Sequence, residues 1–133
     1  MSGARMRGTA VAVAMALATT PVIAVTFESV RYDPNNDQLV VTLIYDGTNP
    51  DHHFSVEWGN CLKLDQPGAP AHQLNVDILD DQGNDATEKT YRKTVTVSLA
   101  SLPCRPARVT LSTTPPVYWN RKTLDIPQRV GLP

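Results

Sequence analysis

Apolar and polar residues alternate along most of the chain beyond residue 24, and a period of two is typical of β-strands. The clearest example lies within residues 52–61, where Phe54, Val56 and Trp58 are each followed by a polar residue or glycine. One apolar face and one polar face predict a half-buried strand. We expect this strand to lie at the centre of the fold.

Further strands are predicted where the same alternation recurs between clusters of Asp, Asn, Gly and Pro, residues that favour turns. The candidates are residues 25–32, 38–45, 74–78, 91–99, 109–111 and 117–126, with Leu62 and Leu64 extending the alternation past residue 61. The 38–45 segment is apolar on both faces, as in a central strand, and should form a hairpin with the segment before it. No window of useful length beyond residue 24 has the period of an amphipathic helix.

Seven strand candidates separated by short turns predict an all-β fold, a small antiparallel β-sandwich with immunoglobulin-like architecture. A small β-barrel is the alternative. We expect a single domain over residues 25–127 and a C-terminal tail over 128–133. The resemblance to immunoglobulin domains is one of architecture only, because Trp58 precedes both cysteines here, whereas antibody domains place a tryptophan between them.

The first 24 residues have the order of a secretory signal peptide. Arg5 and Arg7 precede an apolar run over residues 9–18, and residues 22–24 offer small or tolerated side chains at a cleavage site. A transmembrane anchor is the alternative, but the run is shorter than the ~20 residues that span a bilayer. We therefore expect a periplasmic or secreted protein without stable membrane insertion once the signal is removed.

The two cysteines, Cys61 and Cys104, both follow the predicted signal peptide. In an oxidising compartment they should form a disulfide bond, which would join the end of the Trp58 strand to a later loop. Two free thiols or a metal–thiolate pair are the alternatives. A redox-active pair is usually close in sequence, so we expect this disulfide to be structural.

Charge and composition limit the classes of partner and ligand that we expect. The whole chain has 12 basic and 13 acidic residues, and removal of Arg5 and Arg7 with the signal leaves 10 against 13, a net charge of −3. This balance gives no electrostatic footprint for nucleic acid. All three methionines also lie within the signal, which disfavours a methionine-rich copper(I) site. We expect no cofactor.

Three histidines are candidate ligands for a divalent metal such as zinc or copper(II): His52, His53 and His72, with Asp51 nearby. The alternative is that they are solvated residues at the starts of strands, one of them hydrogen-bonded to the adjacent turn. The acidic stretch 80–85 has some of the oxygen spacing of a calcium loop but lacks its closing glutamate, and a solvated hairpin turn fits it better.

Two further sets of side chains could contact a ligand. Glu57 and Asp77 occupy the polar faces of two predicted strands, where paired carboxylates could act as acid and base if they shared a cleft. Tyr118, Trp119 and Arg121 place aromatic rings beside a basic residue, a combination that suits protein or glycan contacts. We favour a non-catalytic binding module for an envelope or extracellular protein or glycan, with divalent metal binding as the alternative function.

Overall fold

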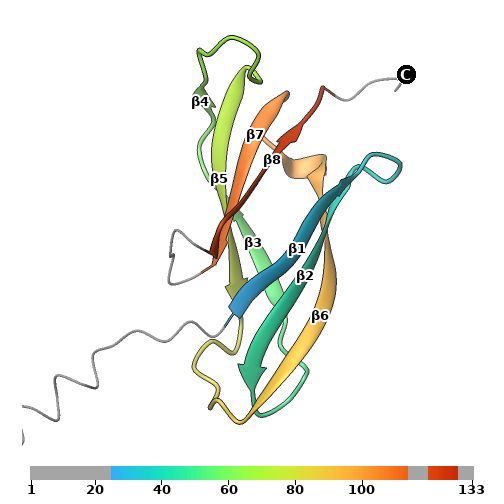
Figure 1. Ribbon diagram of the computed structural model, residues 1–133, viewed down its shortest axis with the longest axis vertical. Helices are drawn as coiled ribbons and strands as arrows, with labels where there is room; N and C mark the ends of the chain where they lie inside the picture. The colour runs from blue at the N-terminus through green and yellow to red at the C-terminus, as the bar shows by residue number, and fades with distance from the viewer. Residues whose placement is uncertain (1–24, 114–119, 129–133) are drawn as a thin grey trace, which may run out of the picture.

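The computed structural model describes residues 25–113 and 120–128, which form a sandwich of two β-sheets (Figure 1). One sheet has three strands in the order β1-β2-β6. The other has five, in the order β3-β5-β7-β8, with β4 also paired to β5. The strands are β1 (Val25–Asp33), β2 (Gln38–Gly47), β3 (Phe54–Trp58), β4 (Leu62–Lys63), β5 (His72–Asp80), β6 (Lys89–Ser98), β7 (Ala107–Thr113) and β8 (Lys122–Ile126).

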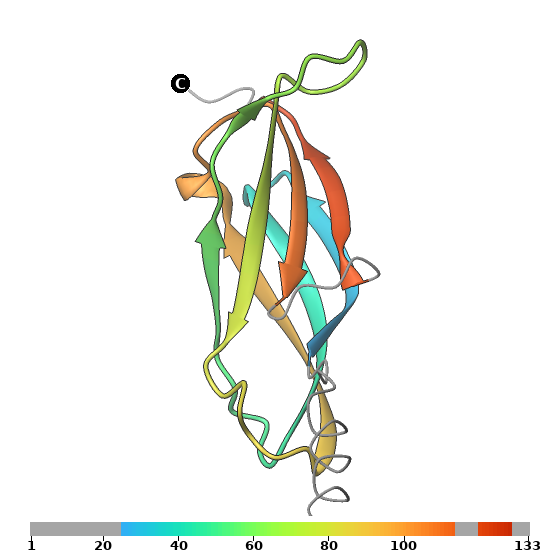
Figure 2. The same cartoon turned by 90° about the vertical axis from the view of Figure 1, so that its left-hand side faces the viewer.

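The predicted all-β sandwich is therefore confirmed, and the sheets do not close into the alternative barrel. Figure 2 shows them as two layers, with β3, β5, β7 and β8 in front of β1, β2 and β6. The predicted signal peptide, residues 1–24, and residues 129–133 of the predicted tail lie outside the described residues. Among the residues that the structure describes, no helix is long and apolar enough to span a membrane.

The three-stranded sheet follows the sequence closely. β1 and β2 form the predicted antiparallel hairpin, and β2 lies between β1 and β6, as its two apolar faces indicated. The hairpin turn ends at Asp37, whose φ of 51° is in the left-handed region that Asp and Asn tolerate better than most residues.

The five-stranded sheet departs from the prediction in two respects. First, β5 and β7 are parallel, whereas an entirely antiparallel sandwich was expected. Parallel neighbours require a long crossover connection. Here the chain leaves β5 and enters the other sheet, where it forms β6. It then returns through a short 3-10 helix, η2 (Leu99–Ser101), before β7 begins.

Second, the Trp58 strand is not central. β3 pairs with β5 alone and lies at the edge of its sheet, while β5 and β7 occupy the middle. The alternation of β3 was correctly interpreted as half-buried, because Ser55 and Glu57 are exposed while Phe54, Val56 and Trp58 pack against the core. A period of two describes the two faces of a strand, but it carries no information about its neighbours.

The core lies between the inner faces of the two sheets. β2 contributes Leu39, Val41 and Leu43, and β5 and β7 contribute Val76 and Leu111 among others, all of them fully buried. Burying each such side chain stabilises the fold by about 1.5–3 kcal/mol relative to leaving it exposed. The inner faces of β2, β5 and β7 therefore supply most of the free energy that holds the layers together.

The predicted disulfide is present. Cys61, between β3 and β4, is bonded to Cys104, between η2 and β7, with Cα atoms 6.3 Å apart. The neighbouring Arg105 reaches the β1–β2 turn, where its Nη2 lies 2.7 Å from Asp37 Oδ2 and also donates to the carbonyl of Leu99. The crossover is thus attached to both sheets just before β7 begins.

A buried amide joins the sheets at the opposite edge. Asn120, which precedes β8 and is 4% exposed, accepts a hydrogen bond from the backbone N–H of Phe27 and donates to the carbonyl of Val25. Its Nδ2 also donates to Thr113 Oγ1 at the end of β7. The sequence offered no sign of this role, because both of its backbone partners are more than 90 residues away.

We expect Asn120→Ala to lower the free energy of unfolding by about 1–3 kcal/mol, because it leaves buried donors and acceptors of β1 without partners. Urea denaturation measures this difference. As a matched control, Asn84→Ala removes an exposed amide and should change stability by less than about 0.5 kcal/mol. Equal effects of the two substitutions would contradict the bridging role of Asn120.

Candidate functional site

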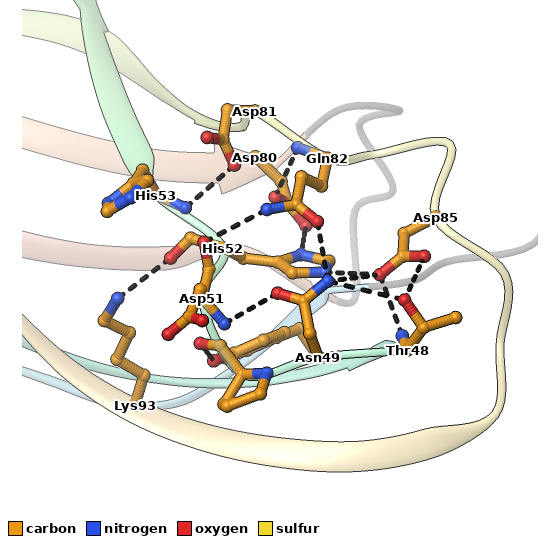
Figure 3. Close-up of polar contacts among 12 residues, drawn as sticks. Thr48, Asn49, Asp51, His52, His53, Asp80, Asp81, Gln82, Asp85 and Lys93 are labelled. Atoms are coloured by element: carbon orange, nitrogen blue, oxygen red, sulfur yellow. Dashed lines mark hydrogen bonds and ion pairs between the residues drawn. The ribbon is translucent and has the colours of Figure 1, made fainter.

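The first predicted site residue, His52, lies two residues before β3 and is completely buried. Its Nδ1 is 2.7 Å from Asp80 Oδ2, and its Nε2 is 2.9 Å from Asp85 Oδ2 (Figure 3). A carboxylate can only accept, so both ring nitrogens carry hydrogen and the ring is an imidazolium between two carboxylates. The ring also lies against Tyr45, with centroids 4.9 Å apart.

Burial by itself acts to lower the pKa of His52, but the hydrogen bonds and charges of Asp80 and Asp85 outweigh it, so the pKa is raised above 6.5. The pKa of Asp85 is lowered to about 2 by hydrogen bonds from Thr48 and His52. The two effects agree in direction, because the proton on the ring and the charge on the carboxylate stabilise each other.

Further hydrogen bonds connect the two loops that meet at this end of the sandwich, residues 48–53 and 81–88. Asp85 accepts from the backbone N–H and the hydroxyl of Thr48, both at 2.8 Å. Gln82 Nε2 donates to the carbonyl of Asp51. From β6, Lys93 Nζ donates to the carbonyl of His52. We call His52, Asp80, Asp85, Thr48 and Gln82 the His52 cluster.

The cluster explains why β2 ends in glycine. A Cβ atom at Gly47 would lie 2.6 Å from His52 Nε2 and 2.7 Å from Asp85 Oδ2, closer than real Cβ atoms approach other atoms. Only glycine allows the ring and the carboxylate to meet beside the strand. Since the ring has no exposed surface, the cluster fastens two loops and offers His52 no access to a ligand.

The structure does not bring the three candidate histidine ligands together. The His53 side chain is exposed, and its backbone N–H donates to Asp81. His72 is the first residue of β5, at the opposite end of that strand from Asp80. His72 Nδ1 lies 3.2 Å from the carbonyl of Pro106. Within residues 25–113 and 120–128, no group of three or more His, Cys, Asp or Glu side chains is arranged to hold a metal ion.

The acidic stretch after β5 also differs from its interpretation as a hairpin turn. It connects β5 in one sheet to β6 in the other, so it crosses between layers. Its carboxylates accept from protein donors: Asp80 from the ring of His52 and the N–H of Gln82, Asp81 from the N–H of His53, and Asp85 from Thr48. These carboxylate oxygens are hydrogen-bonded within the loops of the protein.

A second site lies on the outer face of the five-stranded sheet, the face toward the viewer in Figure 2. Alternation along β5 buries Leu74, Val76 and Ile78 and turns polar side chains outward. There the surface is hollowed by about 360 Å³ across the β3–β4 connection, β5 and β7. The lining residues are Gly59, Asn60, Leu62, Gln73, Leu74, Asn75 and Thr110.

A second hollow of about 260 Å³ adjoins the first and shares Asn75 and Thr110 with it. Its other lining residues are Asp77, Ser112 and Arg121, and Ser112 Oγ donates to Asp77 Oδ1 at 2.9 Å. We call the two together the outer-face hollows. Both lie across β5 and β7, whose parallel pairing places Asn75 opposite Thr110 and Asp77 opposite Ser112.

Gly59 shapes the edge of the larger hollow. Its N–H donates to the carbonyl of Asn75 at 2.7 Å, and a Cβ atom at this position would lie 2.6 Å from that oxygen. Glycine therefore lets the chain that leaves β3 stay close to β5 while it turns toward Cys61. The disulfide fixes the end of the same connection.

Two predicted carboxylates meet on this face. Glu57 and Asp77 are opposite each other in the β3–β5 register, and both are exposed. Asp77 lines the smaller hollow, but Glu57 lines neither hollow. The acid–base hypothesis requires both carboxylates to face one concavity, and neither outer-face hollow meets that requirement.

One member of the predicted aromatic and basic group is placed by the structure. Arg121 lines the smaller hollow beside Asp77, whereas Tyr118 and Trp119 lie outside the described residues. Arg121 and Asp77 thus line the same hollow, although they are 44 positions apart in sequence.

Comparison with known proteins gives no family. No protein-family model matches the chain, and neither the curated proteins nor the solved structures give a match.

The amides of the larger hollow, Asn60, Gln73 and Asn75, were missed by reasoning from the sequence. Alternation did place Asp77 on the polar face of its strand. The missing information was the parallel partner β7, which supplies Thr110 and Ser112 from more than 30 residues away. A search for outward-facing amides close to a glycine would have indicated residues 59–75 as a surface of interest.

The raised pKa of His52 predicts that the cluster stabilises the fold fully below about pH 6.5 and that this contribution is lost as the pH rises through the folded pKa. The lowered pKa of Asp85 predicts a loss at the acid side, as the pH falls from 3.8 toward about 2. Replacement of His52 by Gln should therefore reduce the melting temperature more at about pH 5.5 than at about pH 9. A pH-independent difference would contradict an imidazolium.

Gly47→Ala should displace His52 or Asp85 and lower the free energy of unfolding by about 1–3 kcal/mol, as expected for overpacking. Gly83→Ala is the matched control in the partner loop, because its added Cβ would lie no closer than 3.6 Å to another atom. Chemical denaturation compares the two variants. If Gly47→Ala were as stable as Gly83→Ala, the close approach described above would not constrain the fold.

Proposed function

We propose that this chain is an exported β-sandwich that acts by binding, without chemistry of its own, and that its partner is an envelope or extracellular protein or glycan. The binding surface is the outer face of the five-stranded sheet. The observation that carries the proposal is the pair of adjoining outer-face hollows, lined by amide, hydroxyl, carboxylate and guanidinium groups.

The way polar groups are distributed supports the choice of this face. At the loop end, the carboxylates of Asp80 and Asp85 are both hydrogen-bonded to the ring of His52. On the outer face, by contrast, the side chains of Asn60, Gln73 and Asn75 form no hydrogen bond within the described part of the chain. Convergent polar groups that the fold does not use are available to a ligand.

The disulfide supports export. Cys61 and Cys104 are bonded, and stable disulfides are typical of oxidising compartments such as the periplasm and the extracellular medium. The bond closes a loop of 43 residues, which stabilises a small domain by about 4 kcal/mol in the chain-entropy model. The basic and apolar order of residues 1–24 agrees with the same destination.

The proposal predicts face-dependent retention of a partner from the envelope or medium fraction of the host. Thr110→Arg places a long side chain in both hollows and should abolish retention, because the ligand groups can no longer reach β5 and β7. Thr96→Arg adds the same side chain at an exposed position on the other sheet and should leave retention unchanged.

Affinity capture with the three proteins as baits, compared by mass spectrometry and by glycan composition, measures the difference. Melting temperatures of both variants establish that each one folds. Retention that is equal for the two variants, or absent for the unaltered protein, would contradict a binding role for this face.

A further inference from the structure

We infer that the larger outer-face hollow is a site for a neutral, hydroxyl-rich glycan. The ligand is recognised by the amides of Asn60, Gln73 and Asn75, which have no hydrogen-bond partner among the described residues, beside the exposed side chain of Leu62. The inference rests on the proposed function and names the chemistry of its ligand. Four observations support it: the charge of the lining, its hydrogen-bonding groups, its apolar wall, and the pairing of the backbone beneath it.

The lining of the larger hollow carries no charge. All seven of its residues are neutral, although charged residues lie around it, including Lys63 on β4 and Asp77 on β5. A site for phosphate, a carboxylate or an ammonium group would be expected to offer an opposite charge. A neutral lining complements a neutral ligand and penalises an ionic one, which would lose hydration without gaining a counter-charge.

The hydrogen-bonding groups of the hollow suit hydroxyls. An Asn or Gln side chain presents one acceptor oxygen and two donor hydrogens, while a hydroxyl is at once a donor and an acceptor. Each amide can therefore bond two neighbouring hydroxyls, one through its oxygen and one through its nitrogen. Three such amides, all without hydrogen-bond partners in the described chain, surround the hollow together with Thr110.

The wall of the hollow also contains apolar surface. Leu62, at 57% exposure, is the exposed large hydrophobic residue of the described chain. A single exposed leucine needs no explanation by itself. Its position against three amides matters, because a pyranose ring has a C–H face as well as hydroxyl edges and can contact both kinds of group at once.

The backbone under the hollow disfavours an extended peptide. β5 pairs with β7 on one side and with β3 and β4 on the other, and the carbonyl of Asn75 already accepts from Gly59. A peptide that binds by strand addition needs a free sheet edge. At this position no edge of β5 is free, so recognition must come from side chains.

The adjoining hollow extends the site. It shares Asn75 and Thr110 with the first and adds Ser112 and one residue of each charge, Asp77 and Arg121, so its lining has no net charge. A neutral ligand of two or more sugar units can follow β5 and β7 across both hollows. Asp77, which accepts from Ser112, offers its second oxygen to a further hydroxyl. An oligosaccharide thus fits the pair of hollows better than a monosaccharide.

The test is an NMR titration of the full oxidised protein with a panel of neutral trisaccharides that covers glucose, mannose, galactose, xylose and N-acetylglucosamine. Trigalacturonate and inorganic phosphate serve as charged probes, and a Ser/Asn-rich peptide as the protein-like probe. We expect at least one neutral trisaccharide to shift the side-chain amide signals of Asn60, Gln73 and Asn75, and the other probes to leave them unchanged.

Asn75→Asp keeps the shape and an acceptor but replaces the amide donor with a negative charge. It should weaken trisaccharide binding roughly threefold to tenfold, the effect of losing one neutral hydrogen bond. Asn84→Asp makes the same change in the loop after β5 and should leave binding unaltered. Both variants should melt close to the unaltered protein, since neither amide is bonded within the described fold.

The inference is overturned if no neutral trisaccharide moves these signals, if a charged probe or the peptide moves them equally, or if the two variants bind alike. These outcomes are distinct from failure of the proposed function. A protein partner that is retained by the unaltered chain and lost with Thr110→Arg would leave the binding role standing while it removed the glycan.

Discussion

The contact between the inner faces of β2, β5 and β7 is the interaction on which everything else depends. Leu39, Val41 and Leu43 meet Val76 and Leu111 with no solvent exposure. Because a strand alternates its side chains, burying one face fully determines which residues stand on the other. The polar outer face of β5 is therefore presented by the same pairing that closes the core, and its residues can be chosen for contact with a ligand at little cost in stability.

Alternation predicted the all-β class, the β1–β2 hairpin, the central place of β2 and the polar face of β5, because each follows from local periodicity. The disulfide could be predicted because the chain has two cysteines and an apparent export signal. The edge position of β3 and the parallel β5–β7 pair could not be predicted, since partners are chosen by the whole fold. The outer-face hollows depend on that pair and were equally out of reach.

Polar groups serve two different purposes in this molecule. His52 and Asn120 are almost fully buried, and each satisfies several partners that belong to different elements. Removing either leaves buried groups unpaired, so both act as structural ties. Asn60 and Asn75 are exposed and have no such partners in the described chain. His52 and Asn120 hold the loops and sheets in place. Asn60 and Asn75 lie on the surface of the sheet that those contacts stabilise.

The parallel pairing of β5 with β7 has a consequence for the order in which the molecule is assembled. β5 cannot acquire this neighbour until the chain has passed through the opposite sheet as β6 and returned. The surface that carries Asn75 and Thr110 therefore requires β7, so a nascent or truncated chain that ends before residue 107 would lack it.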